Sequence, residues 1–218
     1  RCLVGSEMCI RDRYNRELKK IRSFIRSRPV KNDFEILFLE NFEKMYRTAD
    51  DILARMETSG CRKLFEESVS KGSVVHGDYN YHNLIMLRDD IAVTDFEHMH
   101  TDIQIKDFCY FLRKAMEKNQ WKQKTGQKIL EAYEEVRPLS EREKEFAALS
   151  LAYPGKFKKI AGSYYRSNKA HLSEKNVEKL QICIRQTEEK YEFLSRIFPL
   201  NLYCLLYTSP SPRDISGS

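Results

Sequence analysis

Residues 74–86, which read VVHGDYNYHNLIM, decide the fold of this chain. The apolar residues at the two ends of the stretch are typical of short β-strands. Between them the sequence places two histidines, an aspartate, two asparagines and two tyrosines. This concentration of polar side chains between two segments of core indicates a loop with a chemical role.

A second polar segment follows a short turn. Residues 88–90 (RDD) predict a tight turn, and residues 91–95 (IAVTD) predict a third strand that ends at Asp95. We expect this hairpin to bring Asp95 back beside Asp78 and Asn83 at one edge of a small sheet. Single aspartates and asparagines are commonly turn formers, but three at this joint spacing favour a site. Their oxygen atoms suit Mg²⁺, and phosphoryl transfer needs oxygens positioned in this way.

The rest of the chain has helical periodicity. A first helix is predicted from a capping residue, Asn15, to the position before Pro29. A longer helix follows and is expected to end at Gly60 as its C-terminal cap. Its apolar stripe consists of Phe34, Phe38, Phe42, Met45, Ala49, Ile52 and Met56. A third helix is predicted at residues 61–70, and helical patterns return after the β segment. The sequence therefore predicts an α+β fold that is mostly helical, with a small β insert carrying the polar loop.

The two ends of the chain carry related sequences. Residues 204–214 (CLLYTSPSPRD) can be encoded by DNA whose reverse complement, in another frame, encodes residues 3–12 (LVGSEMCIRD). A targeting peptide or a disordered tail would not account for this relationship. We therefore interpret residues 1–13 and 204–218 as translated sequencing adaptor, and we expect natural sequence over residues 14–203.

The composition argues against two classes of partner. The 218 residues include 38 Lys and Arg and 32 Asp and Glu, a net charge of +6 that falls to +5 without the two end segments. No basic run alternates with exposed aromatic residues, as in nucleic-acid-binding surfaces. No apolar run approaches the about 20 residues of a membrane span. Cys61, Cys109 and Cys183, the cysteines of the natural segment, lack metal-ligand spacing and are expected to be free thiols. The sequence thus predicts neither a nucleic acid nor a membrane as partner.

The polar loop and the segment after it resemble a known catalytic core. His-Gly-Asp at residues 76–78, Asn83 five positions beyond the aspartate, and Asp-Phe-Glu at residues 95–97 resemble the aminoglycoside phosphotransferase and choline kinase superfamily. The stretches HGDYNYHN, DFCYFLRK and YYRSNKA are similar to its CotS-like spore coat branch. The likeness runs over residues 14–198 and implies a protein-kinase-like C-terminal lobe. No glycine-rich loop or strand lysine precedes it, so we expect the N-terminal lobe to be missing from this chain.

The resemblance implies a role for each residue of the motif. Asp78 would be the catalytic aspartate, which orients the acceptor hydroxyl or accepts its proton. Asn83 and Asp95 would hold Mg²⁺ and, through it, the phosphates of ATP or another nucleoside triphosphate. Glu97 would add a carboxylate on the metal side, and His76 would fix the loop by hydrogen bonds.

The resemblance also implies a function for the parent protein. That protein would transfer the γ-phosphate of a nucleotide to an unknown hydroxyl acceptor, and this chain alone is expected to be inactive. Its location would be the cytoplasm or the spore coat, with other coat proteins as further partners. The alternative is a non-catalytic coat or scaffold protein that keeps the fold for binding. An antibiotic-modifying kinase is a third interpretation, and it would need an acidic pocket for a polycation.

Residues outside the motif carry weaker signals. Trp121, Tyr164 and Tyr165 are expected to pack against the core, with a substrate-facing tyrosine as the alternative. Arg166 and Lys169 are expected on a solvated helix face, although an anionic ligand would also suit them.

Overall fold

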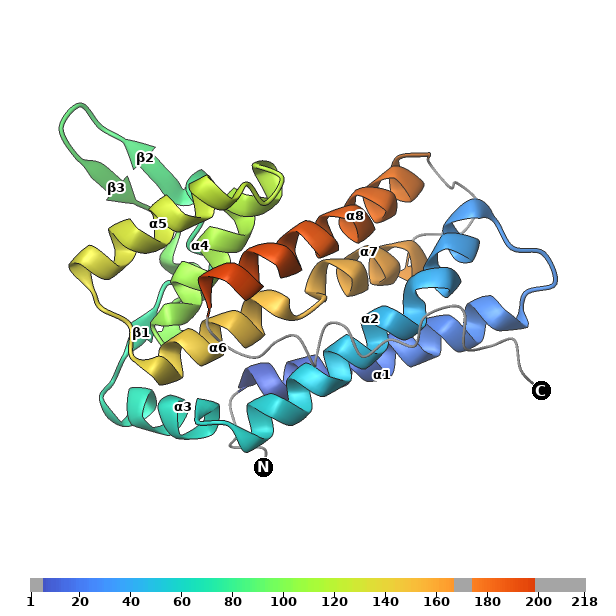
Figure 1. The fold of residues 1–218 in the computed structure, drawn as a ribbon, viewed down its shortest axis with the longest axis horizontal. Coiled ribbons are helices and arrows are strands. Elements are labelled where there is room, and N and C mark those ends of the chain that lie inside the picture. Colours follow the sequence, from blue (N-terminus) through green and yellow to red (C-terminus); the bar gives the residue numbers. More distant parts are fainter. Residues whose placement is uncertain (1–5, 167–173, 199–218) are drawn as a thin grey trace.

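The structure, a computed structural model, describes residues 6–166 and 174–198 (Figure 1). The elements follow the order α1 (Ser6–Ser27), α2 (Asp33–Thr58), α3 (Cys61–Ser70), β1 (Val74–Val75), η1 (Tyr81–Asn83), β2 (Leu84–Met86), β3 (Ile91–Val93), η2 (Phe96–His98), β4 (His100–Thr101), α4 (Ile105–Lys118), α5 (Gln123–Val136), α6 (Glu141–Ala152), α7 (Gly155–Arg166) and α8 (Glu174–Ile197), where η marks a short 3₁₀ helix. The prediction of a mostly helical α+β fold with a small β insert is confirmed.

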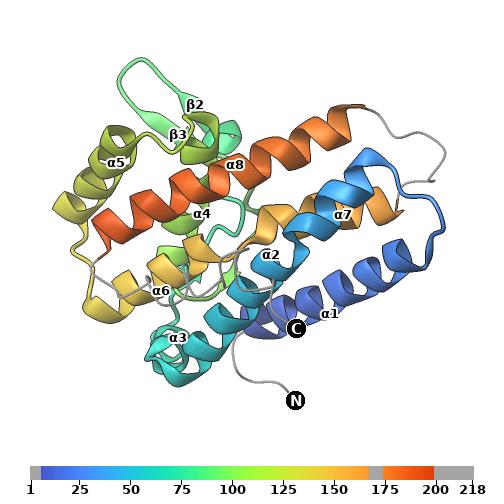
Figure 2. The same ribbon diagram turned by 45° about the vertical axis from the view of Figure 1, so that its right-hand side comes forward.

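The first of two hydrophobic cores lies among α1, α2, α7 and α8, which pack against one another (Figures 1 and 2). The apolar stripe of α2 supplies its aromatic residues. Phe34 stacks on Tyr164 with ring centroids 4.2 Å apart, and Phe38 stacks on Phe157 at 5.2 Å. Such pairs stabilise a core beyond the burial of their area. Tyr164 therefore packs in the core, as predicted.

The second core joins α3, α4, α5 and α6 to parts of α2 and α8. One face of helix α4 contacts the β insert, and another face contributes to this core. Its buried apolar residues are Ile105, Phe108, Cys109, Leu112 and Met116. They recur at steps of three or four positions, so they form one stripe of the helix. Trp121, just beyond α4, is buried against Phe193, with ring centroids 5.9 Å apart, which confirms its predicted packing.

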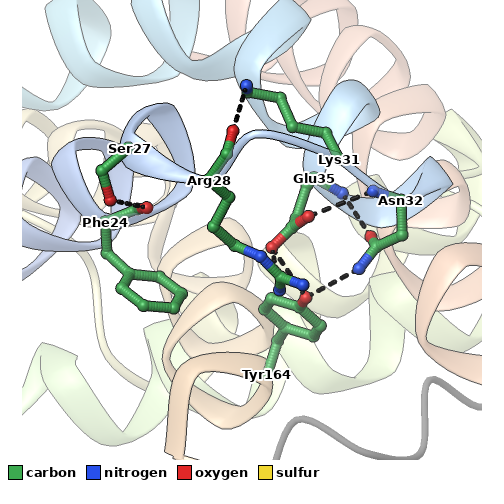
Figure 3. A network of polar contacts seen from close by, with 7 residues as sticks. All are labelled: Phe24, Ser27, Arg28, Lys31, Asn32, Glu35 and Tyr164. Atoms are coloured by element: carbon green, nitrogen blue, oxygen red, sulfur yellow. Dashed lines mark hydrogen bonds and ion pairs between the residues drawn. The ribbon is translucent and has the colours of Figure 1, made fainter.

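A polar network joins the start of α2 to α7 (Figure 3). Asn32 caps α2: its Oδ1 accepts from the Glu35 amide at 3.0 Å, and Glu35 Oε2 accepts from the Asn32 amide at 3.1 Å. The Glu35 side chain is fully buried, and its Oε1 accepts from the Tyr164 hydroxyl at 3.0 Å and from Arg28 at 2.7 Å. A buried carboxylate needs such donors because it has lost its water. The network therefore fixes the first turn of α2 against α7.

The β insert consists of two separate sheets, so the expectation of one small sheet is wrong. Strand β1 pairs antiparallel with β4, and β2 pairs antiparallel with β3. The β2–β3 hairpin projects from the helical body (Figure 1) and has the predicted tight turn, in which the Leu87 amide donates to the Asp90 carbonyl at 2.9 Å. Strand β4 was not expected, because two residues are too few to give a periodic signal.

Two predicted helix boundaries differ from the structure. Helix α1 begins at Ser6, so Asn15 lies inside the helix, where it is buried and accepts a hydrogen bond from the Tyr153 hydroxyl at 2.9 Å. Helix α2 ends at Thr58 with Ser59 as its C-terminal cap, and Gly60 precedes α3 with an ordinary φ of −68°. Both residues suit a helix cap, but Asn15 instead makes a buried hydrogen bond with Tyr153 and Gly60 instead lies at the start of α3.

Other predictions concern single residues and the chain ends. Cys61, Cys109 and Cys183 are free thiols and are buried. Among the described residues, no helix is long and apolar enough to cross a membrane. Arg166 is exposed and pairs with Glu17 at 3.0 Å, as a solvated helix face predicts. Lys169 and residues 204–218 lie outside the described residues, whereas residues 6–13 belong to α1.

Candidate active site

Gly77 allows the 76–83 loop to pass close to the segment that follows Asp95. Its φ of +83° lies in the left-handed region that favours glycine. A Cβ atom at this position would lie 2.4 Å from the carbonyl oxygen of His98, far inside van der Waals contact. Backbone conformation and lack of space therefore both require glycine at this position of the motif.

His76 connects the loop to the end of β3. It is buried, and its Nδ1 accepts from the Asp78 amide at 3.2 Å. This contact leaves the ring proton on Nε2, which lies 2.9 Å from the Thr94 carbonyl oxygen and donates to it. The ring of Phe96 packs against the imidazole with centroids 4.8 Å apart. His76 thus connects the loop to Thr94 and Phe96, the residues on either side of Asp95.

Asp78 and Asn83 are in direct contact. The Asn83 Nδ2 donates to the carbonyl oxygen of Asp78 at 3.0 Å and to its carboxylate Oδ2 at 3.2 Å. Burial raises the pKa of Asp78, but hydrogen bonding from Tyr110, Asn83 and Asn80 lowers it, helped by the charge of His98. The result is a pKa below the usual aspartate value, so the carboxylate is charged at neutral pH.

Asp95 and Glu97 lie on the adjoining segment and are exposed. Asp95 has a φ of +68° and a ψ of +60°, a left-handed conformation that is uncommon for residues other than glycine. Strain of this kind concentrates at functional sites. The preceding residue, Thr94, donates its amide to the Asn83 carbonyl at 3.0 Å, which fixes Asp95 next to the loop. The Glu97 Oε1 lies 3.5 Å from Nε2 of His98.

Two residues of α4 that the sequence reasoning missed complete the site. The carboxylate of Asp107 accepts from the His76 amide at 2.6 Å and from the Gly77 amide at 3.0 Å. One turn further along, the Tyr110 hydroxyl interacts with the Asp78 carboxylate as a hydrogen-bond donor. Burial raises the pKa of Tyr110, and the contact with Asp78 raises it further. Their spacing of three within DFCYFLRK was the available signal, because such residues share one helix face.

The donor atoms of this site fit a magnesium ion bound together with a phosphate. No group of three His, Cys, Asp or Glu side chains forms a ready metal cluster in the described part of the chain. Mg²⁺ does not need one, since it keeps several waters and takes one or two protein oxygens alongside phosphate oxygens. Because the Asn83 Nδ2 is engaged by Asp78, its Oδ1 faces away from that bond, and no described residue donates to it. The Asn83 amide oxygen and the Asp95 carboxylate are both hard oxygen donors.

The fold is that of the protein-kinase-like small-molecule phosphotransferases. The crystal structure of an aminoglycoside phosphotransferase from Alicyclobacillus acidocaldarius subsp. acidocaldarius DSM 446 superposes with a TM-score of 0.80 at 20% sequence identity. The match covers 88% of this chain and 57% of that chain. At this identity the likeness establishes the fold alone.

The sequence places the chain more narrowly. The model of the family described as "Spore coat putative kinase YutH" matches residues 16–197, and the chain belongs to this family. Spore coat protein S of Bacillus subtilis (strain 168) is 26% identical over 166 residues, which are 75% of this chain and 47% of that protein. The predicted resemblance to the spore coat branch of the superfamily is therefore confirmed. The chain spans about half the length of both relatives.

Proposed function

We propose that this chain forms the catalytic-loop half of a phosphotransferase that transfers the γ-phosphate of ATP, or another nucleoside triphosphate, to a hydroxyl acceptor. The observation that carries the proposal is the contact between Asp78 and Asn83 in a loop that is fixed to the segment of Asp95 through His76 and Thr94. Phosphoryl transfer depends on positioned oxygens rather than on covalent chemistry by the protein. This arrangement supplies such oxygens from two short segments, the 76–83 loop and the segment that contains Asp95.

Asp78 is the residue that acts on the acceptor. Its carboxylate is charged at neutral pH because its hydrogen bonds hold the pKa low. A charged carboxylate orients the acceptor hydroxyl and takes up its proton as the phosphate transfers. The contact with Asn83 limits the carboxylate to one orientation, and His76 and Asp107 fix the backbone on which it stands.

Asn83 and Asp95 hold the magnesium ion, with Glu97 as a further carboxylate on the metal side. When bound, Mg²⁺ neutralises the phosphate oxygens of the nucleotide. The left-handed turn at Asp95 and the bond from Thr94 to Asn83 support this role, because they hold the Asp95 backbone beside the loop.

We further propose that the rest of the nucleotide site lies in sequence outside these 218 residues. Both relatives are about twice as long as the matched region, which supports this division. Family membership and the likeness to spore coat protein S support an action in the spore coat or in the cytoplasm of the sporulating cell, with other coat proteins as partners.

Calorimetry of Mg–ATP binding tests the proposal. The complete protein that contains this chain is titrated as wild type, as Asp95→Ala and as Asp78→Ala, and release of ADP with water as the acceptor is measured in parallel. Wild type should bind only with Mg²⁺ present. Asp95→Ala should abolish binding, whereas Asp78→Ala should keep binding and lose turnover. The 218-residue chain should bind at least about 100-fold more weakly, a difference of about 3 kcal/mol, since it would lack the contacts of the second half with the nucleotide.

Two results would overturn the proposal. Undiminished nucleotide binding by Asp95→Ala would remove the metal assignment. Absence of nucleotide binding by the complete wild-type protein would instead support a non-catalytic coat or scaffold protein that keeps the fold.

A further inference from the structure

One face of α4 extends from the 76–83 loop into a row of basic residues. Asp107 and Tyr110 contact the loop, and Lys114 and Lys118 follow on the same face at steps of four residues. At 1.5 Å per residue, these lysines lie about 6 Å and 12 Å along the axis from Tyr110. The row therefore begins at the carboxylate of Asp78 and leads away from it.

Aromatic rings on the loop and on α4 hold these cations in place. The Lys118 Nζ lies 4.2 Å from the ring centroid of Tyr81, which belongs to the loop. The Lys114 Nζ lies 5.6 Å from the ring of Tyr110, and the Arg113 guanidinium lies 4.9 Å from the same ring. Cation–π contacts of this length are attractive without neutralising the charge. They orient the ammonium groups beside the loop and leave them able to bind an anion.

The acidic groups near this face are already engaged elsewhere. Glu117 pairs with Arg113 at 3.0 Å and with Lys156 at 3.4 Å. Asp107 is bound to two loop amides, and Asp102 pairs with Lys106. No carboxylate of the described residues lies within ion-pair distance of Lys114 or Lys118. This face therefore carries an uncompensated positive charge next to the proposed acceptor position.

We infer that the acceptor is a hydroxyl compound that also carries an anionic group, such as a phosphate or a carboxylate, which Lys114 and Lys118 bind while Asp78 faces the hydroxyl. This inference rests on the proposed function, since it assigns the acceptor of the same site. A polycationic acceptor, which the antibiotic-kinase interpretation would need, is disfavoured because it would meet like charges along α4.

Three sugars that share one ring but differ in charge provide the test. Glucose 6-phosphate is anionic, glucose is neutral, and glucosamine is cationic slightly below neutral pH. Each is titrated into the 218-residue chain by NMR, with EDTA and without nucleotide, so that the metal site does not hold the phosphate. Glucose 6-phosphate should bind at least about tenfold more tightly than the other two, and added salt should weaken its binding.

The variant Lys114→Gln/Lys118→Gln should lower the affinity for glucose 6-phosphate by about three- to tenfold, as expected for charge contacts from one exposed and one half-buried lysine. The control is Lys124→Gln/Lys128→Gln, which removes two exposed lysines at the same spacing from α5 and should leave the affinity unchanged. Mg–ATP binding by the complete protein should also be unchanged in Lys114→Gln/Lys118→Gln.

Each contrary outcome has a distinct meaning. Preference for glucosamine, or equal losses in the α4 and α5 variants, would overturn the inference. Weaker Mg–ATP binding in the α4 variant would assign the lysines to the nucleotide and would overturn it as well. Failure of the proposed function would be seen separately, as loss of nucleotide binding by the complete wild-type protein.

Discussion

The amide of Gly77 donates to Oδ1 of Asp107 at 3.0 Å, across a separation of 30 residues in the sequence. The same carboxylate accepts from the His76 amide. Two consecutive amides of the 76–83 loop thus depend on one side chain of α4 rather than on a sheet. The conformation of the loop is therefore coupled to the packing of that helix.

Replacing Asp107 should destabilise the fold and loosen the loop. Asp107→Ala leaves the part-buried amide of His76 and the exposed amide of Gly77 without their acceptor, so we expect a loss of about 1–3 kcal/mol in the free energy of unfolding. Urea denaturation measures the loss, and hydrogen exchange should show faster exchange at the amides of His76 and Gly77. The exposed Asp89→Ala in the hairpin turn is the control and should cost less than about 0.5 kcal/mol. Similar losses in both variants would contradict this account.

Two glycines of the described residues have a positive φ, and they allow steric strain to be separated from backbone strain. Gly72 has a φ of +69°, and a Cβ atom there would meet no other atom within 4 Å, whereas at Gly77 the His98 carbonyl is in the way. Gly72→Ala should cost about 1–2 kcal/mol, the usual penalty for a left-handed residue with a side chain. Gly77→Ala should cost about 2 kcal/mol more, because the loop and the 95–98 segment must separate. Equal Tm shifts for the two variants would show that the close approach is absent in solution.

The Tyr164 hydroxyl should contribute to stability through Glu35. Tyr164→Phe removes one donor to a fully buried carboxylate and one acceptor for Asn32, so we expect a loss of about 1–2 kcal/mol. The matched change is Tyr46→Phe, whose hydroxyl makes exposed contacts with Asp50 at 3.5 Å and with Lys19, and it should matter less than about 0.5 kcal/mol. Thermal melts of both variants test the difference. A larger loss for Tyr46→Phe would refute the importance of the network.

Lys190 should make the free energy of unfolding depend on pH in the alkaline range. It is buried and donates to the carbonyl oxygens of Ala152 at 3.1 Å and Tyr153 at 3.5 Å. Burial lowers its pKa from 10.5 to about 8. Between these values the unfolded chain binds more protons than the folded one, so stability rises with pH. Burial raises the pKa of Cys183 from 9.0 to about 11, which has the opposite effect above pH 9.

The pH interval from 8 to 9 therefore isolates Lys190, and the free energy of unfolding should rise there by about 1 kcal/mol. Urea denaturation at closely spaced pH values measures the slope. Lys190→Met should abolish the rise, whatever its effect at neutral pH. Lys179→Met, an exposed position on the same helix, should keep it. An unchanged slope in Lys190→Met would show that the buried ammonium is not its source.

Sequence patterns predicted the parts of the fold that depend on local periodicity. The stripe of α2 from Phe34 to Met56 has one residue per turn on the buried face, so a helix was the only arrangement that buried it. The spacing from His76 to Asn83 likewise predicted a loop between strands. The start of α1 at Ser6 and the capping of α2 by Ser59 escaped prediction because Asn15 and Gly60 suit several local conformations.

Long-range contacts account for what the sequence did not predict. Asp107 acts on amides 30 and 31 residues away, and no local pattern specifies that distance. Strand β4 has two residues and forms by pairing with β1, so its own sequence is too short to show a strand pattern. The charge of the α4 face was equally hidden, because the sequence does not show which carboxylates the fold brings near Lys114 and Lys118.

The two ends of α4 have different roles, and this difference has a consequence for how such proteins diversify. Its first two turns, with Asp107 and Tyr110, cannot change without disturbing the loop, whereas Lys118 is exposed and Lys114 is only half-buried. Under the proposed function, substitutions at these two outer positions would alter the charge presented to the proposed acceptor while leaving the proposed phosphate-transfer residues in place. A lineage could therefore exchange one acceptor for another through a few surface changes on a single helix, without passing through an unstable intermediate.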